Sequence, residues 1–161
     1  MNARIIYGTN SGCTEEACEI VRDELTRHGW NVVLQRASAT DPKDLGADDL
    51  TILASSTWEH ILPDGKRLES VLQKEWFDLK QQLSAAKTPG KKFAVIGVGD
   101  HRYTHFAAAA DHLSGIIHRM QGVLVGPPLR LDQFGFHLKE SRQQVRNWAA
   151  SLVDGEERSA A

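Results

Sequence analysis

The sequence has few cysteines and no long apolar run, and both absences exclude whole classes of protein. Its two cysteines, Cys13 and Cys18, lack the CxxC spacing of a redox or zinc motif. A disulfide scaffold is therefore excluded, and we expect reduced thiols in a cytoplasmic protein. No apolar run reaches the ~18 residues of a membrane span, and the N-terminus does not have the composition of a signal peptide. We expect no membrane insertion.

A strong charge of either sign is also missing. The 19 Lys and Arg residues nearly balance 21 Asp and Glu residues, so the net charge is -2. Such a chain lacks the basic field that nucleic acid requires, and we expect no nucleic-acid partner. Its length suits one domain, which we place at residues 1–153. The polar segment 154–161 is expected to be a disordered tail.

Apolar runs alternate with helical patterns along the chain. Strands are predicted at residues 5–7, 32–34, 50–54, 93–96 and 123–125, and helices at 15–28, 68–83, 106–120 and 138–152. Trp76 and Trp148 lie on apolar helical stripes and are expected in the core. Strands that are apolar on both faces favour a parallel sheet covered by helices on both sides. Ligands bind such sheets beyond the carboxyl ends of the strands.

The loop after the first strand carries hydroxyl groups and a glycine directly before a helix. It consists of Thr9, Asn10, Ser11, Gly12, Cys13 and Thr14. Backbone N–H groups at a helix N-terminus form an anion site, to which the hydroxyls add donors. The loop has no Lys or Arg, which excludes the GxxxxGK nucleotide loop and suits one terminal phosphate. An ordinary helix cap is the alternative.

Two further loops each carry an aromatic residue. Ser56, Thr57, Trp58, Glu59 and His60 follow the third strand, and the segment after the fourth includes Val98, Gly99, Asp100, Tyr103, His105, Phe106 and Ala107. Trp58 and Tyr103 could hold a planar ring between them. The alternative is that both simply cover the edge of the sheet.

Taken in order, the three loops resemble those of short-chain flavodoxins. The hydroxyl-rich loop, Ser56-Thr57-Trp58 and Gly97-x-Gly99-Asp100-x-x-Tyr103-x-x-Phe106 match that family in identity, spacing and strand context. The resemblance covers roughly residues 3 to 153. It implies an α/β flavodoxin-like three-layer sandwich, with a five-stranded parallel sheet in the order 2-1-3-4-5 and helices on both faces. It also implies one noncovalently bound FMN.

The resemblance further implies how the FMN is held. Thr9 to Thr14 would bind its phosphate, Trp58 and Tyr103 would enclose its ring, and backbone groups of 59–60 and 98–100 would contact the polar edge of the ring. His105, Phe106 and Ala107 complete the expected cofactor-binding set. No catalytic residue and no metal site is predicted.

Several residues depart from the family pattern. Cys13 replaces the usual Asn and Ala107 a common Cys. Glu59 stands where the family has a glycine whose peptide turns toward the flavin on reduction, and Glu resists the positive φ that this turn requires. His60, His101, Arg102 and His105 are expected around the flavin, where relatives often have acids. Because cations favour an anionic flavin, we expect a less negative potential for full reduction.

The function implied is that of a small soluble electron carrier, not an enzyme. We expect a monomer that exchanges electrons with a reductase and an acceptor protein. An FMN-dependent NAD(P)H:quinone reductase is the alternative, which the lack of a second nucleotide fingerprint disfavours. A third possibility is a domain of this fold that binds a partner without flavin.

Overall fold

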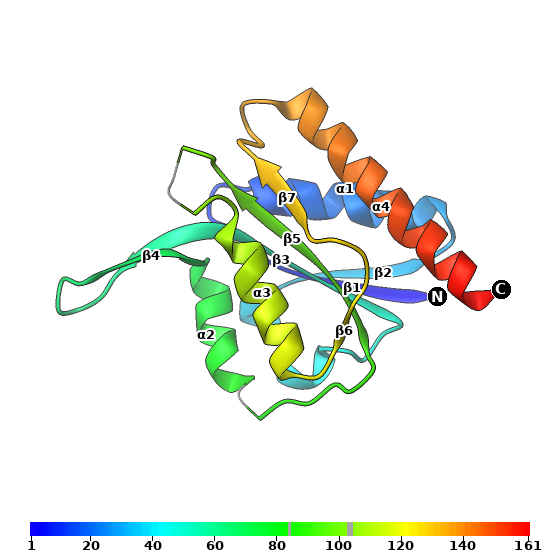
Figure 1. Ribbon diagram of the computed structural model, residues 1–161, viewed down its shortest axis with the longest axis horizontal. Helices are drawn as coiled ribbons and strands as arrows, with labels where there is room; N and C mark the ends of the chain where they lie inside the picture. Colours follow the sequence, from blue (N-terminus) through cyan, green and yellow to red (C-terminus); the bar gives the residue numbers. More distant parts are fainter. Residues whose placement is uncertain (84, 103–104) are drawn as a thin grey trace.

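Strands and helices alternate along the chain in the computed structural model, which describes residues 1–83, 85–102 and 105–161 (Figure 1). The strands are β1 (Asn2–Gly8), β2 (Asn31–Arg36), β3 (Leu50–Ile61), β4 (Arg67–Leu72), β5 (Lys92–Gly99), β6 (Val123–Leu124) and β7 (Leu129–Asp132). The helices are α1 (Cys13–Arg27), α2 (Lys74–Gln82), α3 (Ala108–Arg119) and α4 (Leu138–Ala160), with short 3₁₀ turns η1 (Ala37–Ala39) and η2 (Pro42–Asp44) between β2 and β3.

The sheet has the predicted order. Its hydrogen-bonded path runs β2-β1-β3-β5-β6, and every pair along it is parallel. β7 also pairs with β5 in parallel, farther along that strand, so that β6 and β7 together fill the fifth position. The flavodoxin-like sandwich with the order 2-1-3-4-5 is confirmed. The predicted number of strands is too low, because the sheet has seven.

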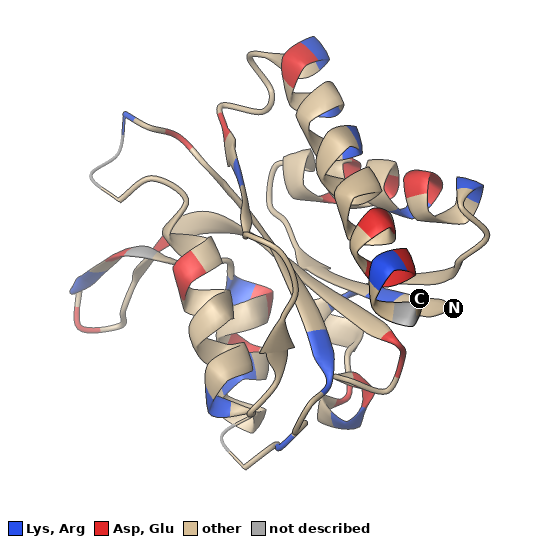
Figure 2. Ribbon diagram, turned by 45° about the vertical axis from the view of Figure 1, so that its right-hand side comes forward, with Lys and Arg blue, Asp and Glu red and all other residues tan. Residues whose placement is uncertain are grey.

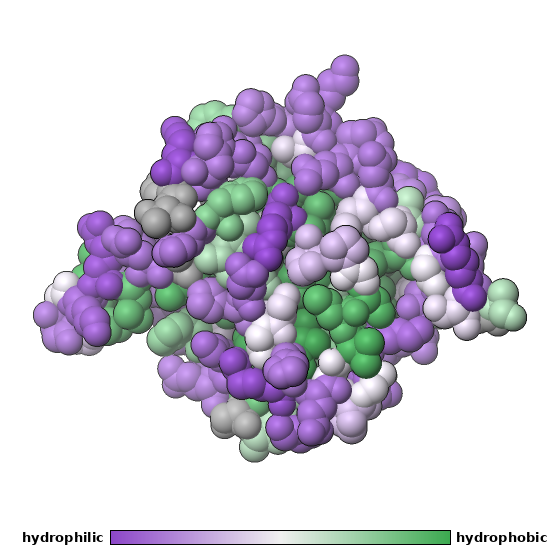
Figure 3. Space-filling view, in the orientation of Figure 1, coloured by the Kyte–Doolittle hydropathy of each residue, from purple (hydrophilic) through white to green (hydrophobic). Residues whose placement is uncertain are grey.

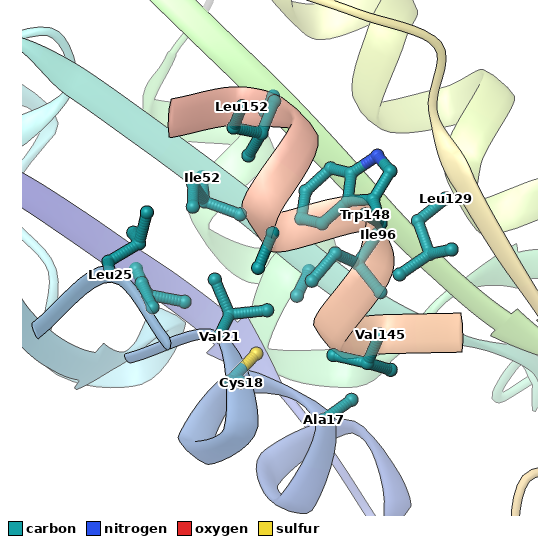
Figure 4. Close-up of a cluster of buried hydrophobic side chains, with 14 of the residues drawn as sticks. Ala17, Cys18, Val21, Leu25, Ile52, Ile96, Leu129, Val145, Trp148 and Leu152 are labelled. Carbon is teal, nitrogen blue, oxygen red and sulfur yellow. The ribbon is translucent and has the colours of Figure 1, made fainter. Parts of the chain in front are cut away.

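Helices cover both faces of the sheet, α1 and α4 on one side and α2 and α3 on the other (Figure 1). Because successive strand residues point to opposite faces, Ile5 packs in the core beneath α1 and α4, and Ile6 in the core beneath α2 and α3. Figure 4 shows the first core, where Trp148 of α4 lies over the sheet. Trp76 is fully buried in the second core. Both tryptophans are core residues, as predicted.

The segment predicted as a helix at 68–83 begins as a strand. β4 pairs antiparallel with the outer half of β3, and the resulting hairpin projects beyond the sheet (Figure 1). The helix α2 starts only at Lys74. Leu68 and Leu72 are four residues apart, which places them on one face of a helix and equally on one face of a strand. Their spacing alone therefore could not distinguish the two structures.

The C-terminal segment is not a disordered tail, because α4 continues to Ala160. Glu156 is buried, and its carboxylate accepts a hydrogen bond of 2.5 Å from the Lys92 ammonium group on β5. This contact fixes the last turns of α4 to the sheet. The composition of the segment is polar because most of its other described residues face solvent.

Most of the visible surface is hydrophilic (Figure 3). An apolar patch lies over β6, where Val123 and Leu124 are exposed at the edge of the sheet. None of the helices in the described ranges has the length and apolar character needed to cross a membrane.

Candidate functional site

The ends of β1 and β5 meet the middle of β3 at one edge of the sheet. The register places Gly8 beside Ser55 and Ser56 beside Val98. The end of β7 joins them, since Asp132 is the partner of Gly99. Ser56 to His60 do not form the predicted loop, because β3 continues through them into the hairpin, and Val98 and Gly99 still belong to β5. The segments that carry the predicted site residues therefore start from neighbouring positions.

The loop between β1 and α1 wraps around the N-terminus of the helix. The Thr9 hydroxyl accepts a hydrogen bond of 3.0 Å from the Gly12 N–H, and Gly12 has a φ of 87°, which favours glycine. The first bond within the helix runs from the Glu16 N–H to the Gly12 carbonyl. The N–H groups of the three residues between them point out of the helix end. Together with the helix dipole, they form an anion site.

Two buried hydroxyls at this edge lack an internal partner. In the described part of the chain, Thr14 Oγ1 and Ser56 Oγ are the buried side-chain polar atoms that make no hydrogen bond. An unsatisfied buried hydroxyl costs about 1–3 kcal/mol, and native proteins rarely retain one without a ligand or a water molecule. Both atoms belong to predicted site residues, so a polar ligand at this edge would satisfy them. Asn10 and Ser11, between β1 and α1, are exposed.

The two residues after Ser56 have different surroundings. The Thr57 hydroxyl accepts a hydrogen bond of 3.1 Å from the Ala109 N–H and so binds the first turn of α3. Trp58 is 42% exposed. A large aromatic side chain exposed at the start of the hairpin can cover a flat ligand.

His60 does not point across this edge of the sheet. Its ring packs against Phe77 of α2, with centroids 5.4 Å apart, and its Nε2 lies 3.1 Å from the Leu72 carbonyl oxygen. His60 therefore fixes the base of the hairpin to α2, and these contacts do not support the expectation that its charge faces the flavin. Glu59 is exposed, and its φ lies outside the left-handed region. Its Oε2 lies 3.7 Å from Nη1 of Arg67.

The glycines of β5 allow α3 to approach the sheet. A Cβ on Gly97 would lie 2.7 Å from Ala110 Cβ, and one on Gly99 would lie 2.7 Å from the Ala107 nitrogen. The space beside these glycines is therefore filled by Ala107 and by α3. Ala107 precedes α3 with a φ of 50°, and Val98 is buried. His105 is exposed, Phe106 is half-buried, and the predicted ring contact Tyr103 lies outside the described residues.

Carboxylates balance two of the cations expected around the flavin. The Arg102 guanidinium donates to Asp100 at 2.5 Å and holds the pKa of that carboxyl below its usual range. His101 Nδ1 lies 2.6 Å from Asp132. Partial desolvation raises the pKa of Asp132, but the hydrogen bonds with His101 outweigh it and lower this pKa. Figure 2 shows both signs of charge interspersed over the molecule. A positive rim built from His101 and Arg102 is therefore not present.

Two residues that the sequence analysis missed support the loop after β5. Gln133 donates its backbone N–H to the Gly99 carbonyl at 2.9 Å and its Nε2 to Asp100 at 3.2 Å. Arg130 donates to the Ala107 carbonyl at 3.2 Å. Both residues act on a segment some 20 to 35 residues earlier. The parallel pairing of β7 with β5 is the signal that could have identified them.

Asp100, His101 and Asp132 bring ligand atoms within 4.8 Å of one another. Arg102 and Gln133 already bind Asp100, and His101 binds Asp132. These groups satisfy one another, so the cluster is a hydrogen-bonded network that joins two loops. We assign no metal to it.

Comparison with known proteins gives a consistent result. The family described as flavodoxin matches residues 5–146. The chain is similar to a flavodoxin of Maridesulfovibrio salexigens, with 30% identity over 93% of this chain and 95% of the relative. It is also similar to a flavodoxin of Nitratidesulfovibrio vulgaris, with 26% identity over 94% and 97%. The crystal structure of oxidised flavodoxin 2 from Bacillus cereus superposes with a TM-score of 0.82 and 28% identity, over 96% of this chain and 99% of that one.

Proposed function

This chain belongs to the flavodoxin family, and we propose that the loops at the carboxyl edge of its sheet hold the FMN with which it carries electrons. Flavodoxins are electron-transfer proteins rather than enzymes, and FMN is their cofactor. When bound, FMN supplies a group that accepts and returns electrons. The protein contributes the binding site, the orientation of the ring and the surrounding charge.

The fit of the site to FMN rests mainly on Thr14. Its hydroxyl is buried without a partner, in the first turn of a helix whose N-terminal amides point outward. A phosphate accepts hydrogen bonds from both kinds of donor, and the helix dipole favours its negative charge. Thr9, Asn10, Ser11, Gly12 and Cys13 complete this loop and are proposed to surround the same phosphate.

We propose that the flavin ring is held by the segments around Trp58 and Tyr103. Trp58 would cover one face of the ring and Tyr103 the other, and Ser56 would donate its unpartnered hydroxyl. Backbone groups of 59–60 and 98–100 would contact the polar edge of the ring, with Thr57 and residues 105–107 holding the loops around it. The bonds from Thr57 to α3 and from Gln133 to Gly99 support this assignment, because they fix the backbone of both segments.

We further propose that the electron donor is a reductase and the acceptor a separate protein, with the chain acting as a cytoplasmic monomer. The paired charges around the site support weak electrostatic steering toward these partners. Electron transfer to a purified acceptor should therefore change little with ionic strength. The molar mass of the FMN-loaded protein, measured by light scattering, tests whether it is a monomer.

The proposed site is tested by comparing FMN with riboflavin, which has the same ring without phosphate. Apoprotein should bind FMN at least tenfold more tightly than riboflavin, as measured by quenching of flavin fluorescence. Trp58→Ala should weaken binding of both ligands, because it removes a ring contact. Equal affinity for the two flavins would refute the phosphate loop, and an unchanged affinity in Trp58→Ala would refute the ring contact.

The reductase alternative predicts a different reaction with nicotinamide. Mixing the FMN-loaded protein with NADPH alone should leave the flavin absorbance unchanged over minutes. Rapid bleaching without a partner protein would favour a reductase that accepts hydride directly.

A further inference from the structure

The two cysteines of the chain have very different surroundings. Cys13 is the first residue of α1 and is half-buried, whereas Cys18 is completely buried one turn further along the same helix. Desolvation raises the pKa of the Cys18 thiol far above its ordinary value, so this residue is expected to be inert. Only Cys13 combines partial exposure with a place in the loop assigned to the phosphate.

Cys13 packs partly against the core beneath α1 and α4, and its sulfur lies beside the loop after β7. Its Sγ lies 3.6 Å from the position that a Cβ on Gly135 would occupy, so the loop after β7 passes close to it. The nearest acidic residues have partners of their own. Glu15 accepts a hydrogen bond from the Tyr7 hydroxyl, and Glu16 pairs with Arg142, both at 2.6 Å.

An independent observation shows that this end of α1 is built for a ligand. The neighbouring Thr14 hydroxyl is fully buried and makes no hydrogen bond. Cys13 thus adjoins a donor that a phosphate would satisfy. A substituent larger than a thiol hydrogen at Sγ would have to displace the loop at Gly135 or shift the loop between β1 and α1, to which Cys13 is joined.

We propose that Cys13 is a modification site at which a mixed disulfide with a small thiol and bound FMN exclude each other. The inference rests on the proposed phosphate loop and adds a redox control of cofactor loading. The co-reactant is a low-molecular-weight disulfide. The Cys13 thiol loses its proton to water, its sulfur attacks one disulfide sulfur, a new S–S bond forms, and the other half leaves as a thiolate. A reducing thiol reverses the exchange.

The experiment treats native apoprotein with glutathione disulfide and counts adducts by intact-protein mass spectrometry. One adduct, on Cys13, is expected. It should form in Cys18→Ser but not in Cys13→Ser, and FMN bound beforehand should slow it at least tenfold. The purified adduct should bind FMN at least tenfold more weakly than untreated apoprotein and regain its affinity with dithiothreitol. Circular dichroism should show that the adduct remains folded.

Three results would overturn the inference: no adduct on Cys13 in folded apoprotein, equal reaction rates with and without FMN, or equal FMN affinity of adduct and untreated protein. In each of these cases the FMN site itself stands if untreated apoprotein takes up FMN. If untreated apoprotein takes up no FMN, the proposed function fails as well.

Discussion

Replacing Thr14 with valine should stabilise the apoprotein and weaken the binding of FMN. Valine has nearly the shape of threonine, with a methyl group in place of the hydroxyl. In the apoprotein the Thr14 side chain is fully buried and its Oγ1 has no partner. The substitution therefore removes an unsatisfied polar atom without opening a cavity. In the loaded protein the same change removes a donor to the phosphate.

The two effects have magnitudes that can be resolved. An unsatisfied buried hydroxyl costs about 1–3 kcal/mol. A gain of about 1 kcal/mol would raise the melting temperature of an apoprotein of this size by roughly 2–4 °C. A hydrogen bond to a charged group contributes about 1.5–3 kcal/mol, so its loss should raise the Kd for FMN about 10- to 150-fold. Stability and affinity should thus move in opposite directions.

Thr51→Val is a matched control. Thr51 is also fully buried, but its hydroxyl accepts a hydrogen bond of 3.2 Å from the Gly46 N–H near the start of β3. This control should destabilise the apoprotein and leave FMN affinity within about twofold. Thermal unfolding of apoprotein and fluorescence titration with FMN measure both quantities. A Thr14→Val apoprotein that melts lower than wild type and binds FMN equally well would refute the argument.

Three other predictions concern the fold around the site. Gly97→Ala should lower stability by about 1–3 kcal/mol in urea unfolding, because its Cβ would lie 2.7 Å from Ala110 Cβ; an unchanged midpoint would contradict this packing. Glu156→Gln should cost about 1–3 kcal/mol and speed amide exchange in residues 154–160, since it weakens the bond to Lys92. Burial and a hydrogen bond to a carboxylate raise the pKa of Tyr7 from 10.0 to about 12. The stability that the protonated Tyr7 hydroxyl contributes is then complete below pH 10 and is lost as the pH rises toward 12. Urea unfolding measured across this range should show the loss in the wild type and not in Tyr7→Phe.

The parallel sheet follows from local sequence patterns, and its strand order from the resemblance of the site segments to those of flavodoxins. Residues 93–96 are continuously apolar, as expected for a strand buried on both faces, and Thr9 to Thr14 carry their signal within one short loop. These features depend on neighbouring residues in the chain and can therefore be predicted from the sequence. The same holds for Trp76 and Trp148, whose helical spacing identified them as core residues.

The features that were missed depend on residues far apart in the sequence. Leu68 and Leu72 fit a helix and a strand equally, and only pairing with β3 selects the strand. Lys92 and Glu156 are 64 residues apart, so nothing local shows that the last turns of α4 are fixed. The sequence shows the charged residues near Asp100 but not that Arg102 pairs with it, and this pairing determines how much positive charge Arg102 presents to a flavin.

These long-range contacts also explain why the site can exist before its ligand arrives. Thr57 binds α3, and Gln133 joins the end of β5 to the loop after β7, so both loops are held by contacts within the protein. The hydroxyls of Thr14 and Ser56 are the buried side-chain atoms left without a partner in the described chain. At these contacts the binding of FMN has less backbone to order, and a preorganised site loses less affinity to conformational entropy. The cost appears in the apoprotein, whose stability is lowered by the two polar atoms that its own fold does not satisfy.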